Sequence, residues 1–96
     1  MPAYFIVDQL EVTDPDTMKK YAAGVQATLD KYGAKALVRG GAFEVIEGGY
    51  TPKRIVLLQF ADKAAFKRWY NSPEYAELKR LRLSSSKSNA VMVEGV

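Results

Sequence analysis

Residues 54–61 read Arg-Ile-Val-Leu-Leu-Gln-Phe-Ala, a run typical of a β-strand because aliphatic and aromatic side chains dominate it. Successive side chains of a strand point to opposite faces of the sheet. In this run, both faces of the strand carry apolar side chains. Ile55 and Leu57 point to one face, and Val56, Leu58 and Phe60 point to the other. A strand of this kind predicts a sheet that is covered on both of its faces.

Helix signals lie on either side of this strand. Asp14 and Pro15 predict the start of a helix over residues 15–32, and Gly33 predicts its end. The apolar residues within it recur at helical spacing: Met18, Tyr21, Ala22, Val25, Leu29 and Tyr32. Asp62 predicts the start of a second helix. The dipeptide Ser72-Pro73 predicts that this second helix stops and a third one begins.

The remaining segments complete an alternating order of strands and helices. We predict further strands over 4–12, 34–38, 42–47 and 89–94, with residues 84–86 as a loop. The middle pair, separated by Gly40-Gly41, is either a hairpin or one long strand with a bulge. The order β-α-β-β-α-β predicts an α+β fold of the ferredoxin-like type, with an antiparallel sheet and helices on one face.

The first and last predicted strands also carry apolar side chains on both faces. The helices of so short a chain suffice to cover only one face of the sheet. A second copy of the chain, packing its own sheet against the open face, is the simplest cover. The sequence therefore predicts a homodimer.

The composition excludes several kinds of chemistry. The chain has 96 residues and contains neither cysteine nor histidine. Without cysteine there are no disulfides, thiolate nucleophiles or iron–sulfur clusters. Without histidine there are no imidazole bases, Ser-His-Asp triads or histidine-ligated haem. We expect no metal and no cofactor, so any reaction must use arginine, tyrosine, amide or carboxylate groups.

The charge pattern argues against nucleic-acid and membrane partners. Fourteen basic and eleven acidic residues give a net charge of +3, and the two signs are interleaved along the chain. Nucleic-acid-binding proteins more often gather their basic residues into a stripe. No apolar run approaches the roughly 18 residues of a membrane-spanning helix, and residues 1–8 lack the basic start of a signal peptide. We therefore expect a cytoplasmic protein.

Several short motifs, in matching order and spacing, resemble the DUF1330 family. In chain order they are Leu37-Val38-Arg39-Gly40-Gly41, Val45-Ile46-Glu47-Gly48, Phe60, Trp69-Tyr70-Asn71-Ser72-Pro73-Glu74-Tyr75, Leu81-Arg82 and Val93-Glu94-Gly95. The resemblance extends over about residues 3–95. One mild departure is Gly33-Ala34, where the family often has two glycines, and it affects only the local turn.

This resemblance implies a single domain over residues 1–96 with the fold of the dimeric α+β barrel superfamily. The family has no assigned function. Its superfamily includes cofactor-free monooxygenases, lactone isomerases, haem-degrading enzymes and simple ligand binders, so the resemblance leaves the activity open.

Arg39 heads the list of candidate site residues. Gly40 and Gly41 after it allow a positive φ and close approach of a neighbouring group, and its guanidinium could bind a carboxylate ligand. Alternatively, Arg39 pairs with Glu47 in a structural salt bridge. Glu47 and Asp8 are the candidate catalytic bases. Asp8 interrupts an apolar strand, so it either serves a buried site or faces the wet end of the strand.

The aromatic segment around residue 70 supplies the other candidates. Its structural explanation is an apolar helix face followed by a break. As a ligand site, Tyr70, Asn71 and Tyr75 would donate hydrogen bonds, and Trp69 would form an apolar wall. Arg82, near the end of the third helix, either stabilises the helix dipole or joins Arg39 in anchoring an anionic or carbonyl oxygen.

The sequence leaves three functions open. The first is the binding of a small organic molecule in a pocket between the sheet and the helices of a homodimer. The second is a cofactor-free enzyme, of monooxygenase or isomerase type, acting on a small oxygenated substrate. The third is a non-catalytic dimerisation or assembly protein, in which the apolar strands serve association alone.

Overall fold

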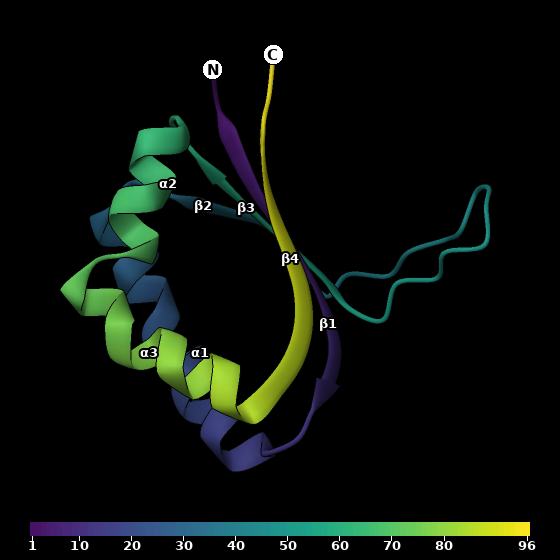
Figure 1. The fold of residues 1–96 in the computed structure, drawn as a ribbon, viewed down its shortest axis with the longest axis horizontal. Coiled ribbons are helices and arrows are strands. Elements are labelled where there is room, and N and C mark those ends of the chain that lie inside the picture. The colour runs from purple at the N-terminus through teal and green to yellow at the C-terminus, as the bar shows by residue number, and fades with distance from the viewer.

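The computed structural model describes all 96 residues and forms one four-stranded sheet with three helices (Figure 1). In chain order the elements are β1 (Ala3–Val12), α1 (Pro15–Lys31), β2 (Lys35–Arg39), β3 (Ile55–Phe60), α2 (Lys63–Tyr70), α3 (Pro73–Ser85) and β4 (Ser86–Glu94). The strand order is β2-β3-β1-β4, and all three pairings are antiparallel. This confirms the ferredoxin-like α+β fold.

The three helices begin where the sequence predicts. Asp14, Asp62 and Ser72 each precede a helix in extended backbone, and each side chain accepts a hydrogen bond from an amide of the first turn. Gly33 follows α1 with φ of 69°, a left-handed conformation that costs glycine little. No helix is long and apolar enough to cross a membrane.

The predicted loop over residues 84–86 is wrong. Helix α3 continues to Ser85, and strand β4 begins at the next residue. The serine hydroxyls explain this tight junction, because they bond back to the last turn of the helix: Ser85 donates to the carbonyl of Leu81 at 2.6 Å, and Ser86 to that of Arg82 at 2.7 Å. The bond from Ser86 satisfies a carbonyl that the helix end would otherwise leave free.

The predicted strand over residues 42–47 is also wrong. Strand β2 ends at Arg39, after a bulge between Ala36 and Val38, and β3 begins at Ile55. Residues 40–54 between them form a long loop that extends away from the body, on the side of the sheet opposite the helices (Figure 1). Residues 42–47 are mostly apolar, but no neighbouring backbone in this chain pairs with them.

The core lies between the sheet and the helices. Trp69 of α2 and Tyr75 of α3 are fully buried, and their ring centroids are 3.9 Å apart. The indole nitrogen of Trp69 donates to the hydroxyl of Thr28 at 3.0 Å, which ties α2 to α1. Phe60 of β3 and Leu29 of α1 are the other large side chains with almost no exposure.

The other face of the sheet has no helix over it. Ile6 lies at its centre, with Leu57 of β3 opposite it on one side and Val91 of β4 on the other. Val91 and Val93 are 59% and 49% exposed, although both are β-branched residues suited to a covered sheet. The strands therefore carry apolar side chains on this open face as well as on the helix-facing one, as the sequence predicts.

An ion pair and a hydrogen bond connect the start of α3 to the end of α1. Glu74 pairs with Lys31 and accepts a hydrogen bond from the hydroxyl of Tyr32 at 2.9 Å. The contact with Lys31, with its own backbone amide and Tyr32 adding to it, lowers the pKa of Glu74 from 4.5 to about 2.

The lowered pKa predicts a pH dependence with a definite sign. The unfolded chain titrates Glu74 near 4.5, so this contact stabilises the fold fully above that pH and is lost as pH falls toward 2. A carboxyl ¹³C titration of Glu74 is expected to give a midpoint at about pH 2, which Lys31→Met raises toward 4.5. A normal midpoint in the unsubstituted protein would contradict the contact.

Candidate functional site

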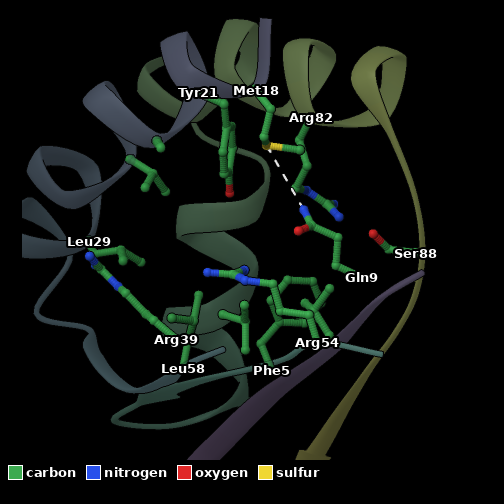
Figure 2. A pocket seen from close by; sticks show the side chains of 14 residues that line it. Phe5, Gln9, Met18, Tyr21, Leu29, Arg39, Arg54, Leu58, Arg82 and Ser88 are labelled. Atoms are coloured by element: carbon green, nitrogen blue, oxygen red, sulfur yellow. Dashed lines mark hydrogen bonds between the residues drawn. The ribbon is translucent and has the colours of Figure 1, made fainter. Parts of the chain in front are cut away.

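A cavity of about 200 Å³ lies between the sheet and helices α1 and α3 (Figure 2). Its apolar walls come from the helix-facing side of β1 and β3 and from the inner face of α1: Phe5, Val7, Val25, Leu29, Val56 and Leu58. Its deeper lining includes buried residues such as Leu29 and Leu58, while Ala22, Arg39 and Arg54 are exposed and mark its mouth. The cavity is therefore an apolar chamber with polar groups at a few points.

Arg82 of α3 enters this cavity from the helix side, and only 7% of it is exposed. Its Nε atom is buried without a hydrogen-bond partner, and none of the chain's ion pairs includes it. The last turn of α3 offers it a favourable helix dipole. That interaction is modest beside the cost of burying a charge without a counter-ion.

A second orphaned group lines the same cavity. The hydroxyl of Ser88, on β4, is buried and has no hydrogen-bond partner. Most buried polar groups in proteins are hydrogen-bonded, so an unpaired one calls for an explanation. The only two buried side-chain polar atoms without partners in this chain, Arg82 Nε and Ser88 Oγ, belong to residues that line one cavity.

Arg54 approaches from the sheet side. Figure 2 shows its side chain extending into the cavity, between the sheet and the hydroxyl of Tyr21. Its side chain lies directly over Gly40, where a Cβ atom would come within 2.5 Å of Arg54 Nε. Gly40 also has φ of 66°. The glycine after Arg39 thus serves the close approach that the motif predicts, and the approaching group is Arg54.

This contact gives a matched pair of substitutions. Gly40→Ala is expected to displace Arg54 and to lower the free energy of unfolding by at least about 1–2 kcal/mol, because a side chain is strained at positive φ. Gly41→Ala is the control, since its φ is ordinary and no other atom lies within 4 Å of the added Cβ. Urea denaturation and the Arg54 Nε resonance check both variants. Equal effects at the two positions would contradict this packing.

A pair of tyrosines forms the wall beside Arg82. Tyr21 of α1 lines the cavity, and its hydroxyl lies 2.8 Å from that of Tyr75. Burial is the main cause that raises the pKa of both groups, and the Arg82 guanidinium partly offsets the rise at Tyr75. Both hydroxyls are therefore protonated near neutral pH, so Tyr21 can donate a hydrogen bond into the cavity.

The structure separates the predicted ligand-binding residues. Arg39 and Arg82 line the cavity, whereas Trp69, Tyr70, Asn71 and Tyr75 do not. Trp69 and Tyr75 belong to the core, and Tyr75 lies beside two lining residues, Tyr21 and Arg82. Tyr70 packs under Lys79, whose Nζ lies 4.1 Å from the ring centroid, and Asn71 is exposed at the end of α2.

Arg39 stands at the rim of the cavity, exposed to solvent. Its guanidinium donates a hydrogen bond to Gln26 of α1, and the predicted salt bridge with Glu47 is not formed. Glu47 lies in the exposed loop 40–54, beyond the end of β2. The charge of Arg39 therefore has no carboxylate partner within the chain.

Asp8 lies outside the cavity, on the open face of the sheet, and is buried under the loop 40–54. Its carboxylate accepts hydrogen bonds from the Tyr50 hydroxyl at 2.5 Å and from the backbone amides of Lys53 at 2.9 Å and Arg54 at 3.3 Å. The bond from Tyr50 is the main reason why the pKa of Asp8 is lowered. Asp8 thus fixes the backbone from which Arg54 reaches the cavity.

No three acidic side chains gather closely enough to hold a metal ion. The polar groups that line the cavity are guanidinium groups, the hydroxyls of Tyr21 and Ser88 and the amide of Gln9, which are suited to bind oxygen atoms of a partner molecule.

Comparison with known sequences identifies the family. Residues 2–96 match the family model described as a domain of unknown function, DUF1330. The chain belongs to this family. No curated protein matches the sequence.

Solved structures share the fold of this DUF1330 chain at low sequence identity. A protein of unknown function from Rhodopseudomonas palustris has a TM-score of 0.77 at 13% identity, over 99% of this chain and 82% of that one. A dimeric ferredoxin-like protein of unknown function from Jannaschia sp. CCS1 gives 0.70 at 15%, over 99% and 100%. SnoaB, a cofactor-independent oxygenase from Streptomyces nogalater, gives 0.59 at 13%, over 99% and 93%.

Sequence reasoning missed four polar residues of the cavity in this DUF1330 chain: Gln9, Tyr21, Arg54 and Ser88. The signals for them are nonetheless present. Arg54 is two residues before Val56, so strand alternation places it on the helix-facing side. Ser88, Ala90 and Met92 are each two residues apart, so they also share the helix-facing side. Tyr21 falls on the inner face of α1 by helical spacing.

Proposed function

We propose that this DUF1330 protein binds a small organic molecule in the cavity between the sheet and the helices. The observation that carries the proposal is the coincidence of the two orphaned polar atoms, Arg82 Nε and Ser88 Oγ, in one apolar cavity. A cavity of about 200 Å³ has room for a compact organic molecule. Such a ligand would supply partners for both atoms and fill the space between the walls.

The binding unit that we propose is a homodimer. The apolar open face around Ile6, Leu57 and Val91 supports it, as does the loop 40–54, which extends on the same side as that face (Figure 1). Phe43, Val45 and Ile46 of this loop are exposed, which suits contact with a second copy. The Jannaschia protein of similar fold is described as dimeric. A cytoplasmic location stays a prediction from the sequence.

The test compares a variant that fills the cavity with one that does not. In Val56→Phe the added ring enters the cavity, whereas Leu83→Phe enlarges an exposed residue of α3 outside it. A panel of small organic fragments is screened by ¹⁵N–¹H NMR. We expect some fragments to shift amides of the cavity lining in the unsubstituted protein and in Leu83→Phe, and to lose this effect in Val56→Phe.

Two results would contradict the proposal. If no fragment shifts the lining amides, the cavity is not a binding site, and the assembly role becomes the better account. If the shifts persist unchanged in Val56→Phe, the fragments bind elsewhere. Native mass spectrometry of freshly purified protein adds an independent readout, since a co-purifying ligand should be present in Leu83→Phe and absent from Val56→Phe.

The alternative function, cofactor-free oxygenation or isomerisation, has one specific point in its favour. Tyr21 presents a protonated hydroxyl to the cavity, where it could stabilise an oxyanion of a substrate. The predicted bases Asp8 and Glu47 gain no support from their placement, because neither lines the cavity. Dioxygen consumption in the presence of a bound fragment, abolished in Tyr21→Phe, would favour the enzyme over the simple binder.

A further inference from the structure

The charged lining of the cavity is positive throughout. Three of its fourteen residues are arginines, Arg39, Arg54 and Arg82, and none is an aspartate or glutamate. The chain as a whole is only mildly basic, with fourteen basic and eleven acidic residues. This one-sided charge around an apolar chamber is therefore a local property of the site.

The three guanidinium groups also lack acidic partners elsewhere. None of them takes part in an ion pair of the chain. Asp8, the carboxylate next to Arg54 in the fold, lies on the other face of the sheet and binds the backbone amide of Arg54. The positive charge that converges on the cavity is thus not neutralised by the protein itself.

The burial of Arg82 indicates which charge its missing partner carries. Arg82 is almost wholly buried, and a neutral carbonyl oxygen would satisfy its Nε hydrogen without neutralising its charge. An anionic oxygen does both, and the planar fork of a guanidinium matches the two oxygens of a carboxylate.

We infer that the ligand is an organic anion, a carboxylate with an apolar body, whose charged end lies between Arg54 and Arg82. This inference rests on the proposed function. The Tyr21 hydroxyl donates to the same end, and the apolar body lies against Leu29 and Leu58. Arg39 at the rim adds attraction for the entering anion. Gly40 takes part indirectly, because its missing side chain leaves room for that of Arg54.

The experiment uses matched probes that differ in charge alone. Hexanoate and benzoate are titrated into the full-length protein beside hexanamide and benzamide, and binding is followed through the lining amides by NMR. Inorganic phosphate tests charge without an apolar body. We expect each carboxylate to bind at least about tenfold more tightly than its amide, since a hydrogen bond to a charged group is stronger than a neutral one.

Variants assign the preference to the arginines. Arg82→Met and Arg54→Met should each lower carboxylate affinity by about tenfold or more while amide affinity changes little. Lys87→Met removes the same charge from an exposed site on β4 outside the cavity and should leave both affinities unchanged. Arg54 is exposed, so Arg54→Met tests the role of charge without changing the buried core.

The outcomes separate this inference from the proposed function. If hexanamide and benzamide bind the cavity as tightly as the carboxylates do, the inference of an anionic ligand is overturned, whereas the proposed binding function is kept. Loss of carboxylate affinity in Lys87→Met equal to that in Arg54→Met would also overturn it, because the effect would be one of net charge. If neither the carboxylate probes nor the amide probes shift the backbone amide resonances of the cavity lining, the anionic ligand and the proposed binding function are both overturned.

Discussion

Trp69→Ala is expected to lower the free energy of unfolding by about 3–5 kcal/mol, a loss comparable to the whole stability of many small domains. Trp69 is fully buried and packs against Tyr75 and Phe60, with ring centroids 3.9 and 5.3 Å away. The substitution would also leave the Thr28 hydroxyl without its indole donor. Urea denaturation followed by circular dichroism measures the loss.

Trp69→Phe is the matched control, because it keeps an aromatic ring and removes the indole N–H. It should fold and retain binding of cavity ligands, since Trp69 lies outside the lining of the cavity. A loss below about 1 kcal/mol in Trp69→Ala would be too small for a residue at the centre of the core. Altered ligand affinity in Trp69→Phe, with stability unchanged, would restore the predicted role of Trp69 as a wall of the site.

Ile6→Asp is expected to convert the proposed dimer into a monomer, with a dissociation constant raised by at least about 100-fold. Ile6 lies between Leu57 and Val91 at the centre of the open face, so a carboxylate there would be buried without a partner in the dimer. In the monomer the same carboxylate would face water, so the fold should survive. Sedimentation velocity at micromolar concentration measures the change.

Ala64→Asp is the control for added charge, because Ala64 is exposed on α2, on the helix side of the sheet. It should remain dimeric. A monomeric unsubstituted protein at micromolar concentration would contradict the dimer directly. A dimeric Ile6→Asp would place the interface on some other face and leave the apolar surface around Val91 and Val93 without a role.

The sequence predicts most of this fold because local signals mark each helix. Asp14-Pro15, Asp62 and Ser72-Pro73 start the three helices, and Gly33 ends the first. The apolar residues within 42–47 were misleading, since a strand needs a neighbouring backbone to pair with, and the chain offers none there. The three serines of 84–86 suggest a loop by composition, but their hydroxyls bond to helix carbonyls.

The candidate site was harder to predict, because it depends on which side chains the fold brings together. Arg39 and Arg82 both line the cavity, and they come from β2 and α3. The partner that joins Arg82 from the sheet side is Arg54, which stands outside any recognisable motif. Its position follows from the φ of Gly40 and from the hydrogen bonds of Asp8, two features that appear only in three dimensions.

A binding site that holds an unpaired charge carries a cost in stability. Uncompensated buried charges destabilise the protein that contains them, so replacement by an apolar side chain of similar length should relieve the cost. A guanidinium kept for structure behaves in the opposite way, because its loss leaves its partners unsatisfied. The sign of one change in stability therefore distinguishes the two roles of Arg82.

The most direct measurement is the free energy of unfolding of the ligand-free protein and of Arg82→Met, compared by urea denaturation. The account predicts that Arg82→Met is more stable, by about 1–4 kcal/mol, while its affinity for organic anions falls. A loss of about 3–5 kcal/mol in the ligand-free variant would instead mean that Arg82 is paired and structural, and would contradict a cavity built to receive a ligand.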